Sequence, residues 1–164
     1  MLFQNESTHL CNINFFCTFS YAQEYIDIIV VKKSERILYA VKDDKIRKKY
    51  KIFLGKNPIG HKKMQGDKKT PEGYYYIDGK NAKSKFYLSL HTSYPNFHDK
   101  KIAEKKNLDP GNHIAIHGLP EISLLSQYLY DNSDWTDGCI ALDNEDMKEL
   151  WSMTHEGTQI LIKP

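Results

Sequence analysis

The chain contains little cysteine, glycine or proline, the residues that are abundant in disulfide-rich, collagen-like or low-complexity proteins. Its 164 residues include 3 Cys, 9 Gly and 6 Pro, which excludes a disulfide scaffold, a collagen-like repeat and a low-complexity chain. It also lacks any run approaching the ~20 apolar residues that would span a bilayer. A chain of this length can bury a core without help from a disulfide or a metal. We therefore expect one globular domain.

A large net charge is also lacking, but the total conceals a division along the chain. The formal net charge is +2. Residues 1–106 contain 21 Lys or Arg against 11 Asp or Glu, whereas residues 107–164 contain 2 against 10. The net charge alone indicates no charged partner, but the uneven distribution of charge along the chain is compatible with one.

The first 22 residues are ambiguous. The apolar run 13–19 and the small residue Ala22 are typical of a secretory signal and its cleavage site, although no Lys or Arg precedes the run. A first strand, or an extension upstream of the true start, would explain the same residues. We expect a degenerate export signal over 1–22 and one domain over 23–164. Cleavage would leave Cys139 as the one remaining cysteine.

The hydrophobic pattern after residue 22 predicts a mostly β or β-rich α+β domain. Alternating or β-branched runs predict strands at 25–31, 36–41, 45–54, 74–77, 86–90, 113–117 and 159–163. Helices are predicted at 121–130, after Pro120, and at 144–154, with Asp143 as the N-cap. Residues 94–112 are expected to form a polar connection. Residues 55–73 contain four Gly and two Pro and form a connection long enough to be functional.

The residues best able to carry chemistry surround Cys139. This cysteine follows a polar segment and precedes an apolar strand, and Gly138 would let backbone N–H groups approach a group under attack, as in an oxyanion hole. A thiol needs a base to become a nucleophile, and His117, at a strand end before Gly118, is the candidate. A buried apolar cysteine and a structural core histidine are the alternatives.

Metal and nucleic-acid sites find little support. His113 and His117 would lie about 13 Å apart on a strand, too far to share one ion. A zinc site formed by His91, His98 and Cys139 would lack any recognised ligand spacing. The basic segment 42–69 resembles no nucleic-acid motif, and a solvated hairpin explains most of its lysines.

Four groups of residues follow one another in a distinctive order. They are Gly60-x-Lys62-x-x-Gln65-Gly66-Asp67-x-x-Thr70-Pro71-Glu72-Gly73, Ser89-Leu90-His91-x-Ser93-Tyr94-Pro95-Asn96, His117-Gly118-Leu119-Pro120 and Asp134-Trp135-Thr136-x-Gly138-Cys139-Ile140-x-Leu142. Together they resemble the YkuD-type L,D-transpeptidase family, in particular its YafK-like branch. The resemblance extends over about residues 25–162.

The resemblance implies a β-sandwich catalytic domain with a few short helices, located in the periplasm or cell envelope. It implies that Cys139 attacks the peptidoglycan stem peptide before its terminal D-Ala, with His117 as the base, and forms a thioester. Thr136, Asp137 and Gly138 would support the oxyanion site. The acyl group would pass to another stem peptide, to a lipoprotein lysine or, in hydrolytic members, to water. No metal, organic cofactor, nucleic acid or integral membrane segment is implied.

Two positions depart from the family pattern. Asp137 stands where many members have His, and Ala141 stands where many have Arg. Recognition of a substrate carboxylate would then fall to Lys62, Lys63 or His91. The other expected substrate-binding residues are Tyr94, Gly118 and Trp135. The resemblance places the lysine-containing loop 60–73 beside the cleft that holds Cys139. The excess of positive charge in residues 1–106 therefore favours an anionic substrate.

The departures keep a second class of function open, a non-catalytic peptidoglycan-binding module that retains the fold. Thiol reactivity separates the two classes. A Cys139 thiol activated by His117 is expected to alkylate well below pH 8, whereas an unperturbed thiol has a pKa of about 8.5.

Overall fold

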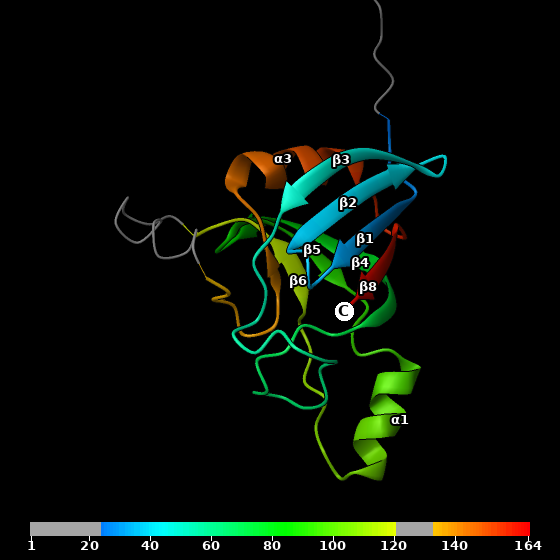
Figure 1. Cartoon of the computed structure of the whole chain (residues 1–164), viewed down its shortest axis with the longest axis vertical. Coiled ribbons are helices and arrows are strands. Elements are labelled where there is room, and N and C mark those ends of the chain that lie inside the picture. The colour runs from blue at the N-terminus through cyan, green and yellow to red at the C-terminus, as the bar shows by residue number, and fades with distance from the viewer. Residues whose placement is uncertain (1–23, 121–132) are drawn as a thin grey trace, which may run out of the picture.

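The computed structural model describes residues 24–120 and 133–164 and is dominated by strands (Figure 1). In chain order the described elements are β1 (Ile28–Lys32), β2 (Ile37–Lys42), β3 (Lys45–Lys51), β4 (Gly73–Ser84), β5 (Tyr87–Thr92), α1 (Phe97–Lys105), β6 (Ala115–His117), β7 (Ile140–Ala141), α3 (Asn144–Met153) and β8 (Gln159–Lys163). None of the helices in these ranges is long and apolar enough to cross a membrane.

The strands form one sheet in the order β3-β2-β1-β8-β4-β5-β6-β7. Strand β4 serves both halves of this sheet, because residues 73–76 pair with β8 and residues from Ile77 onward pair with β5. The register shifts between Ile77 and Gly79, and such an irregularity lets a strand bend and change sheet.

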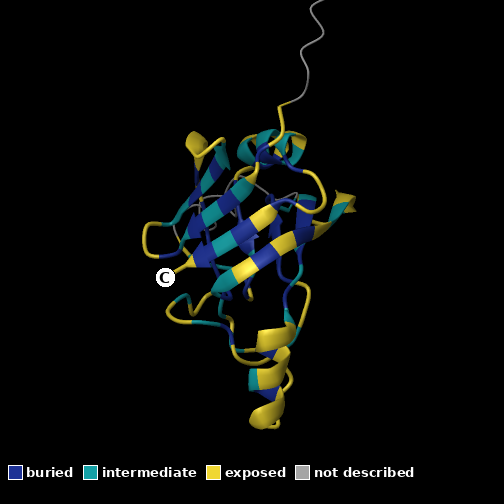
Figure 2. Ribbon diagram, turned by 90° about the vertical axis from the view of Figure 1, so that its right-hand side faces the viewer, coloured by how far each residue is buried: buried dark blue, intermediate teal, exposed yellow. Residues whose placement is uncertain are grey.

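The two halves of the sheet share one hydrophobic core. Alternate side chains of β1 and β8 point inward, so that the buried positions of these strands are Ile29, Val31, Ile160 and Ile162. The inward residues of β5, β6 and β7 belong to the same cluster, as do Met147 and Leu150 of α3. Figure 2 shows the resulting alternation of buried and less buried residues along the strands. The expected β-rich sandwich with few helices is confirmed.

The two ends of the sheet are joined just beyond β3. The Phe53 N–H donates to the Ala141 carbonyl at 2.9 Å, and the Ala141 N–H donates to the Phe53 carbonyl at 2.8 Å. Gly55 and Thr136 form a second bridge nearby. The segment that leads to Cys139 is therefore fixed against the first part of the chain.

Most predicted strands are confirmed to within a few residues, but the expected connection over 94–112 is wrong in part. It contains α1, which projects away from the sheet (Figure 1). Only Asp99 and Ala103 of α1 are buried, so that the helix has no apolar stripe from which to predict it. The capping box formed by Asn96 and Asp99 was the available signal.

The predicted helix over 144–154 is confirmed as α3. Asp143 occupies its N-cap position, although its side chain makes no capping hydrogen bond. The predicted helix over 121–130 and the expected signal over 1–22 lie outside the described residues.

Candidate active site

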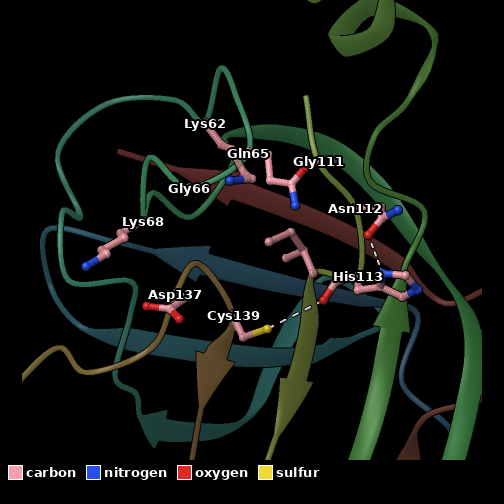
Figure 3. A pocket seen from close by; sticks show the side chains of 10 residues that line it. Lys62, Gln65, Gly66, Lys68, Gly111, Asn112, His113, Asp137 and Cys139 are labelled. Carbon is pink, nitrogen blue, oxygen red and sulfur yellow. Dashed lines mark hydrogen bonds between the residues drawn. The ribbon is translucent and has the colours of Figure 1, made fainter. Parts of the chain in front are cut away.

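A pocket of about 360 Å³ opens where β6 and β7 approach the long connection after β3 (Figure 3). Three segments form its wall, namely parts of residues 62–68, residues 111–114, and the turn that contains Asp137 and Cys139. The Gln65 N–H donates to the Asp109 carbonyl at 2.8 Å, which joins the first two segments. The thiol therefore faces a cavity with a defined wall.

The Cys139 thiol has a protein partner in this pocket. Its Sγ donates to the His113 carbonyl at 3.6 Å (Figure 3). Burial raises the pKa of the thiol, the Ala115 N–H lowers it, and the Asp137 carboxylate raises it further, so that the pKa lies above its ordinary value. Cys139 is consequently a neutral thiol at pH 7.

Thr136 fixes the turn that carries the thiol. Its Oγ1 donates to the Cys139 carbonyl at 2.7 Å and accepts the Gly138 N–H at 3.1 Å. Gly138 has φ +133°, and a Cβ there would lie 2.7 Å from the Lys69 carbonyl oxygen, so that glycine is required. Because the Gly138 N–H already has a partner, Thr136 and Gly138 support backbone geometry. The predicted contribution of this turn to an oxyanion site stays a prediction.

Asp137 points its charge away from this network. Its exposed carboxylate lies 3.6 Å from the Lys56 ammonium. As an anion it raises the pKa of the Cys139 thiol and does not assist thiolate formation.

His117 ends β6 and is almost fully buried, with 3% of its surface exposed. Its Nδ1 lies 2.7 Å from the Gly118 carbonyl oxygen. Because a carbonyl can only accept, Nδ1 carries the proton and Nε2 keeps a lone pair in the neutral ring. Burial lowers the pKa of the imidazole, and the Gly118 hydrogen bond partly offsets this. His117 is therefore a neutral ring with one basic nitrogen.

Aromatic side chains hold the imidazole in place. Phe86 stacks on the His117 ring with centroids 4.4 Å apart, and Trp135 meets the ring edge-on at 5.7 Å. A Cβ at Gly118 would lie 2.4 Å from Asn144 Oδ1, so that the residue after the histidine must also be small. The predicted roles of Trp135 and Gly118 in binding substrate are untested, but both residues shape the surroundings of the base.

The thiol and the imidazole arise from neighbouring parallel strands. His117 pairs with Ala141, two residues after Cys139, so that both side chains lie on one face of the sheet. Within the described residues, however, the thiol donates to the His113 carbonyl and not to the imidazole. Catalytic hydrogen bonds often form only when substrate is bound.

The two pKa shifts predict a resting thiol that reacts slowly. The thiolate is the reactive form, and its fraction at a given pH falls as the pKa rises. We expect the iodoacetamide alkylation rate of Cys139 to keep rising with pH beyond about 8.5, the ordinary thiol pKa. Mass mapping of the Cys139 peptide measures this rate, and the denatured chain supplies the control. A plateau below about pH 8, as expected from the sequence, would contradict the structure.

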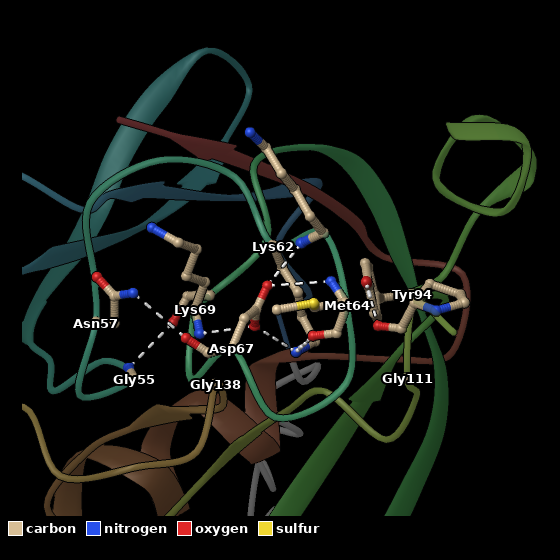
Figure 4. Close-up of polar contacts among 12 residues, drawn as sticks. Gly55, Asn57, Lys62, Met64, Asp67, Lys69, Tyr94, Gly111 and Gly138 are labelled. Carbon is tan, nitrogen blue, oxygen red and sulfur yellow. Dashed lines mark hydrogen bonds and ion pairs between the residues drawn. The ribbon is translucent and has the colours of Figure 1, made fainter. Parts of the chain in front are cut away.

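Lys62 is not available in the way expected from the sequence. Lys62 lines the pocket, but its side chain is only 4% exposed, and its ammonium forms an ion pair with Asp67 at 2.8 Å and donates to the Met64 carbonyl (Figure 4). Asp67 also accepts the N–H groups of Lys63, Met64 and Lys69. Burial raises the pKa of Asp67, but the hydrogen bonds from Lys62 and these N–H groups lower it by more. The pKa lies below its ordinary value, and Asp67 is a carboxylate. Lys62 therefore organises the loop from within.

The remaining predicted binding residues lie at different distances from the pocket. Lys63 is exposed and is not part of the wall, and His91 sits on β5, with β6 between it and Cys139. Tyr94 is buried, and its hydroxyl donates to the Pro110 carbonyl at 2.8 Å, which braces the neighbouring wall segment. Lys68, which sequence reasoning missed, lines the pocket as an exposed cation. Nothing in the sequence distinguishes it from its neighbouring lysines.

Metal ligation has no candidate in the described parts of the chain. No group of three His, Cys, Asp or Glu side chains within residues 24–120 and 133–164 could hold an ion. The pocket itself presents the Cys139 thiol, and His117 is not among the described residues that line it.

Comparison with known proteins places these features in a family. A model of the YkuD family, described as the L,D-transpeptidase catalytic domain, matches residues 26–162. The Escherichia coli K12 protein named "Putative L,D-transpeptidase YafK" is 28% identical over 104 residues, which cover 62% of this chain and 35% of that protein. The chain thus spans about a third of this curated relative.

Solved structures agree with this match. The helical cell shape determining protein Pgp2 from Campylobacter jejuni superposes with a TM-score of 0.62 at 29% identity, over 87% of this chain and 49% of that one. An L,D-transpeptidase from Xylanimonas cellulosilytica superposes with a TM-score of 0.54 at 16% identity, over 85% and 61%, which supports the fold alone.

Proposed function

Because the chain belongs to the YkuD family of L,D-transpeptidase catalytic domains, we propose that it cleaves and transfers peptidoglycan stem peptides through a cysteine acyl-enzyme. One arrangement carries the proposal. The Cys139 thiol faces a pocket, and the neighbouring strand presents His117 with its Nδ1 proton fixed by the Gly118 carbonyl. The Nε2 lone pair is thereby available as a base.

The first half of the reaction breaks the bond before the terminal D-Ala. Cys139 Sγ attacks the carbonyl carbon while His117 Nε2 takes the thiol proton. Since both groups are neutral at rest, proton transfer accompanies attack. The imidazolium then returns the proton to the amine of D-Ala, which leaves, and the acyl group remains on Sγ as a thioester.

The second half depends on the acceptor. His117 removes a proton from an incoming amine, the amine attacks the thioester carbonyl, and the Cys139 thiolate leaves and regains the proton. An amine on a second stem peptide gives a crosslink, a lipoprotein lysine gives an anchored protein, and water gives a shortened peptide. Hydrolysis is thus the alternative outcome of one machinery.

The pocket wall offers an exposed cation to an anionic substrate, beside the Asp137 carboxylate. Lys62 is neutralised by Asp67 inside the loop, which leaves the exposed Lys68 as the cation of the wall that can meet a substrate carboxylate. We place the protein in the cell envelope, where peptidoglycan lies. Similarity to Pgp2 extends the proposal to a part in determining cell shape.

Incubation of the full chain with a disaccharide tetrapeptide tests the proposal. We expect release of D-Ala and an adduct on Cys139, both detected by mass spectrometry. A crosslinked dimer identifies transfer, and a free disaccharide tripeptide identifies hydrolysis. If neither D-Ala nor an adduct is found while the protein still sediments with peptidoglycan sacculi, the chain is a binding module and the enzymatic proposal is wrong.

A further inference from the structure

Arg36 lies far from Cys139 in the sequence but is ion-paired to the segment that carries it. In the turn between β1 and β2, its Nε and Nη2 donate to Asp134 Oδ2 at 3.0 and 2.7 Å, and Nε also lies 3.1 Å from Oδ1. The side chains of Arg36 and Asp134 are 36% and 16% exposed. A guanidinium–carboxylate pair with several hydrogen bonds and partial burial is directional as well as strong.

Asp134 also joins a third segment. Its Oδ1 accepts the Leu54 N–H at 2.8 Å, and the Leu54 carbonyl accepts the Thr136 N–H at 3.1 Å. Residues 134–136 are consequently held between the β1–β2 turn and the chain beyond β3.

The two residues after Asp134 reach both proposed catalytic groups. Trp135 packs edge-on against the His117 ring. Thr136 accepts the Gly138 N–H and donates to the Cys139 carbonyl. A displacement of Asp134 would therefore move His117 through Trp135, and Cys139 through Thr136.

The backbone of Arg36 gives an independent reason to assign its side chain a role. Its φ is +55°, in the left-handed region that glycine adopts without strain and that disfavours other L-residues. The N–H of Arg36 donates to the Lys33 carbonyl at 3.2 Å, and its Nη1 donates to the same carbonyl, so that the turn aims the guanidinium outward to Asp134.

We propose that Arg36, through its ion pair with Asp134, is a positioning residue that sets the placement of Cys139 relative to His117. The expected effect of Arg36 on turnover rests on the proposed function. The expected effect of Arg36 on the Cys139 thiol is independent of that function, because the reactivity of the thiol can be measured without a substrate.

The test uses Arg36→Gly, which relieves the left-handed backbone and removes the guanidinium. Small displacements of reacting groups cost up to about 100-fold, so we expect kcat to fall roughly 10- to 100-fold. KM should change much less than kcat, since two of the three wall segments, in residues 62–68 and 111–114, lie outside the turn that Arg36 holds. Arg36→Lys should give an intermediate kcat, because one ammonium cannot reproduce the forked contact. Lys32→Ala removes an exposed ion pair with Glu35 in the same turn, and this control should change neither constant.

Alkylation provides the readout that loss of stability alone would not give. A loosened turn exposes the half-buried thiol further to water, so we expect the midpoint of Cys139 alkylation in Arg36→Gly to move to lower pH. The variant would then be a worse catalyst with a more reactive thiol. Asp134→Asn keeps an acceptor for the Leu54 N–H and serves as the second variant if circular dichroism shows that Arg36→Gly does not fold.

The outcomes are distinct. Folded variants with unchanged kcat and an unchanged alkylation midpoint would overturn the inference and leave the pair a surface contact. If the wild-type chain shows no turnover, the proposed function fails, and the alkylation midpoint alone decides whether Arg36 positions the thiol.

Discussion

Cys139→Ala is expected to lower the release of D-Ala from a disaccharide tetrapeptide by about 10⁴-fold or more, because removing a nucleophile abolishes the covalent route. The thiol donates to the His113 carbonyl and accepts from the Ala115 N–H, and it belongs to no buried hydrophobic cluster of the described residues, so the fold should persist. Mass spectrometry of products and of the intact protein measures both losses.

The chain supplies an internal control for this variant. Cys11 and Cys17 remain in Cys139→Ala, so an adduct that forms on any accessible thiol would still be seen on their peptides. Cys139→Ser adds a matched isostere whose hydroxyl is a poorer nucleophile. Retention of D-Ala release in a folded Cys139→Ala protein would exclude the proposed mechanism.

His117→Gln is expected to lower kcat by roughly 10² to 10⁴, the usual contribution of a general base. The glutamine amide can still donate to the Gly118 carbonyl but offers no basic nitrogen. Since the thiol donates to the His113 carbonyl and not to the imidazole, the pH midpoint of Cys139 alkylation should change little. A fall in kcat without a shift of that midpoint is the expected signature.

His113→Asn is the matched control for the base. His113 also lines the pocket, but its backbone, not its ring, contacts the thiol. Its φ is +58°, which asparagine tolerates better than most residues. We expect kcat close to that of the wild type. If His113→Asn lost as much activity as His117→Gln, the base would be misassigned.

Local pattern was sufficient to predict most of the sheet and to single out Cys139 and His117 as candidates for the chemistry. Strands β1, β2 and β8 are apolar runs rich in β-branched residues, and alternate residues of each are buried. Cys139 and His117 stand at junctions of loop and strand. Register then brings their strands together, as the motifs indicated.

The environment of each site residue could not be predicted in the same way. Lys62 and Lys68 are the same residue type in one loop, yet the first is buried against Asp67 and the second faces the pocket. The pairing of Arg36 with Asp134 joins segments far apart in the chain, which no local pattern records. Burial raises the pKa of the Cys139 thiol. The sequence predicts the opposite, a thiol activated by His117.

The position of β8 constrains the order in which the protein can fold. Gln159–Lys163 follows every other described strand in the chain, yet it lies between β1 and β4 and pairs with both. Until it is available, both partner strands expose unpaired backbone groups, and the core lacks Ile160 and Ile162. Pairing of β1 with β8, which are more than 120 residues apart, gives a high contact order, so we expect slow folding that waits for β8.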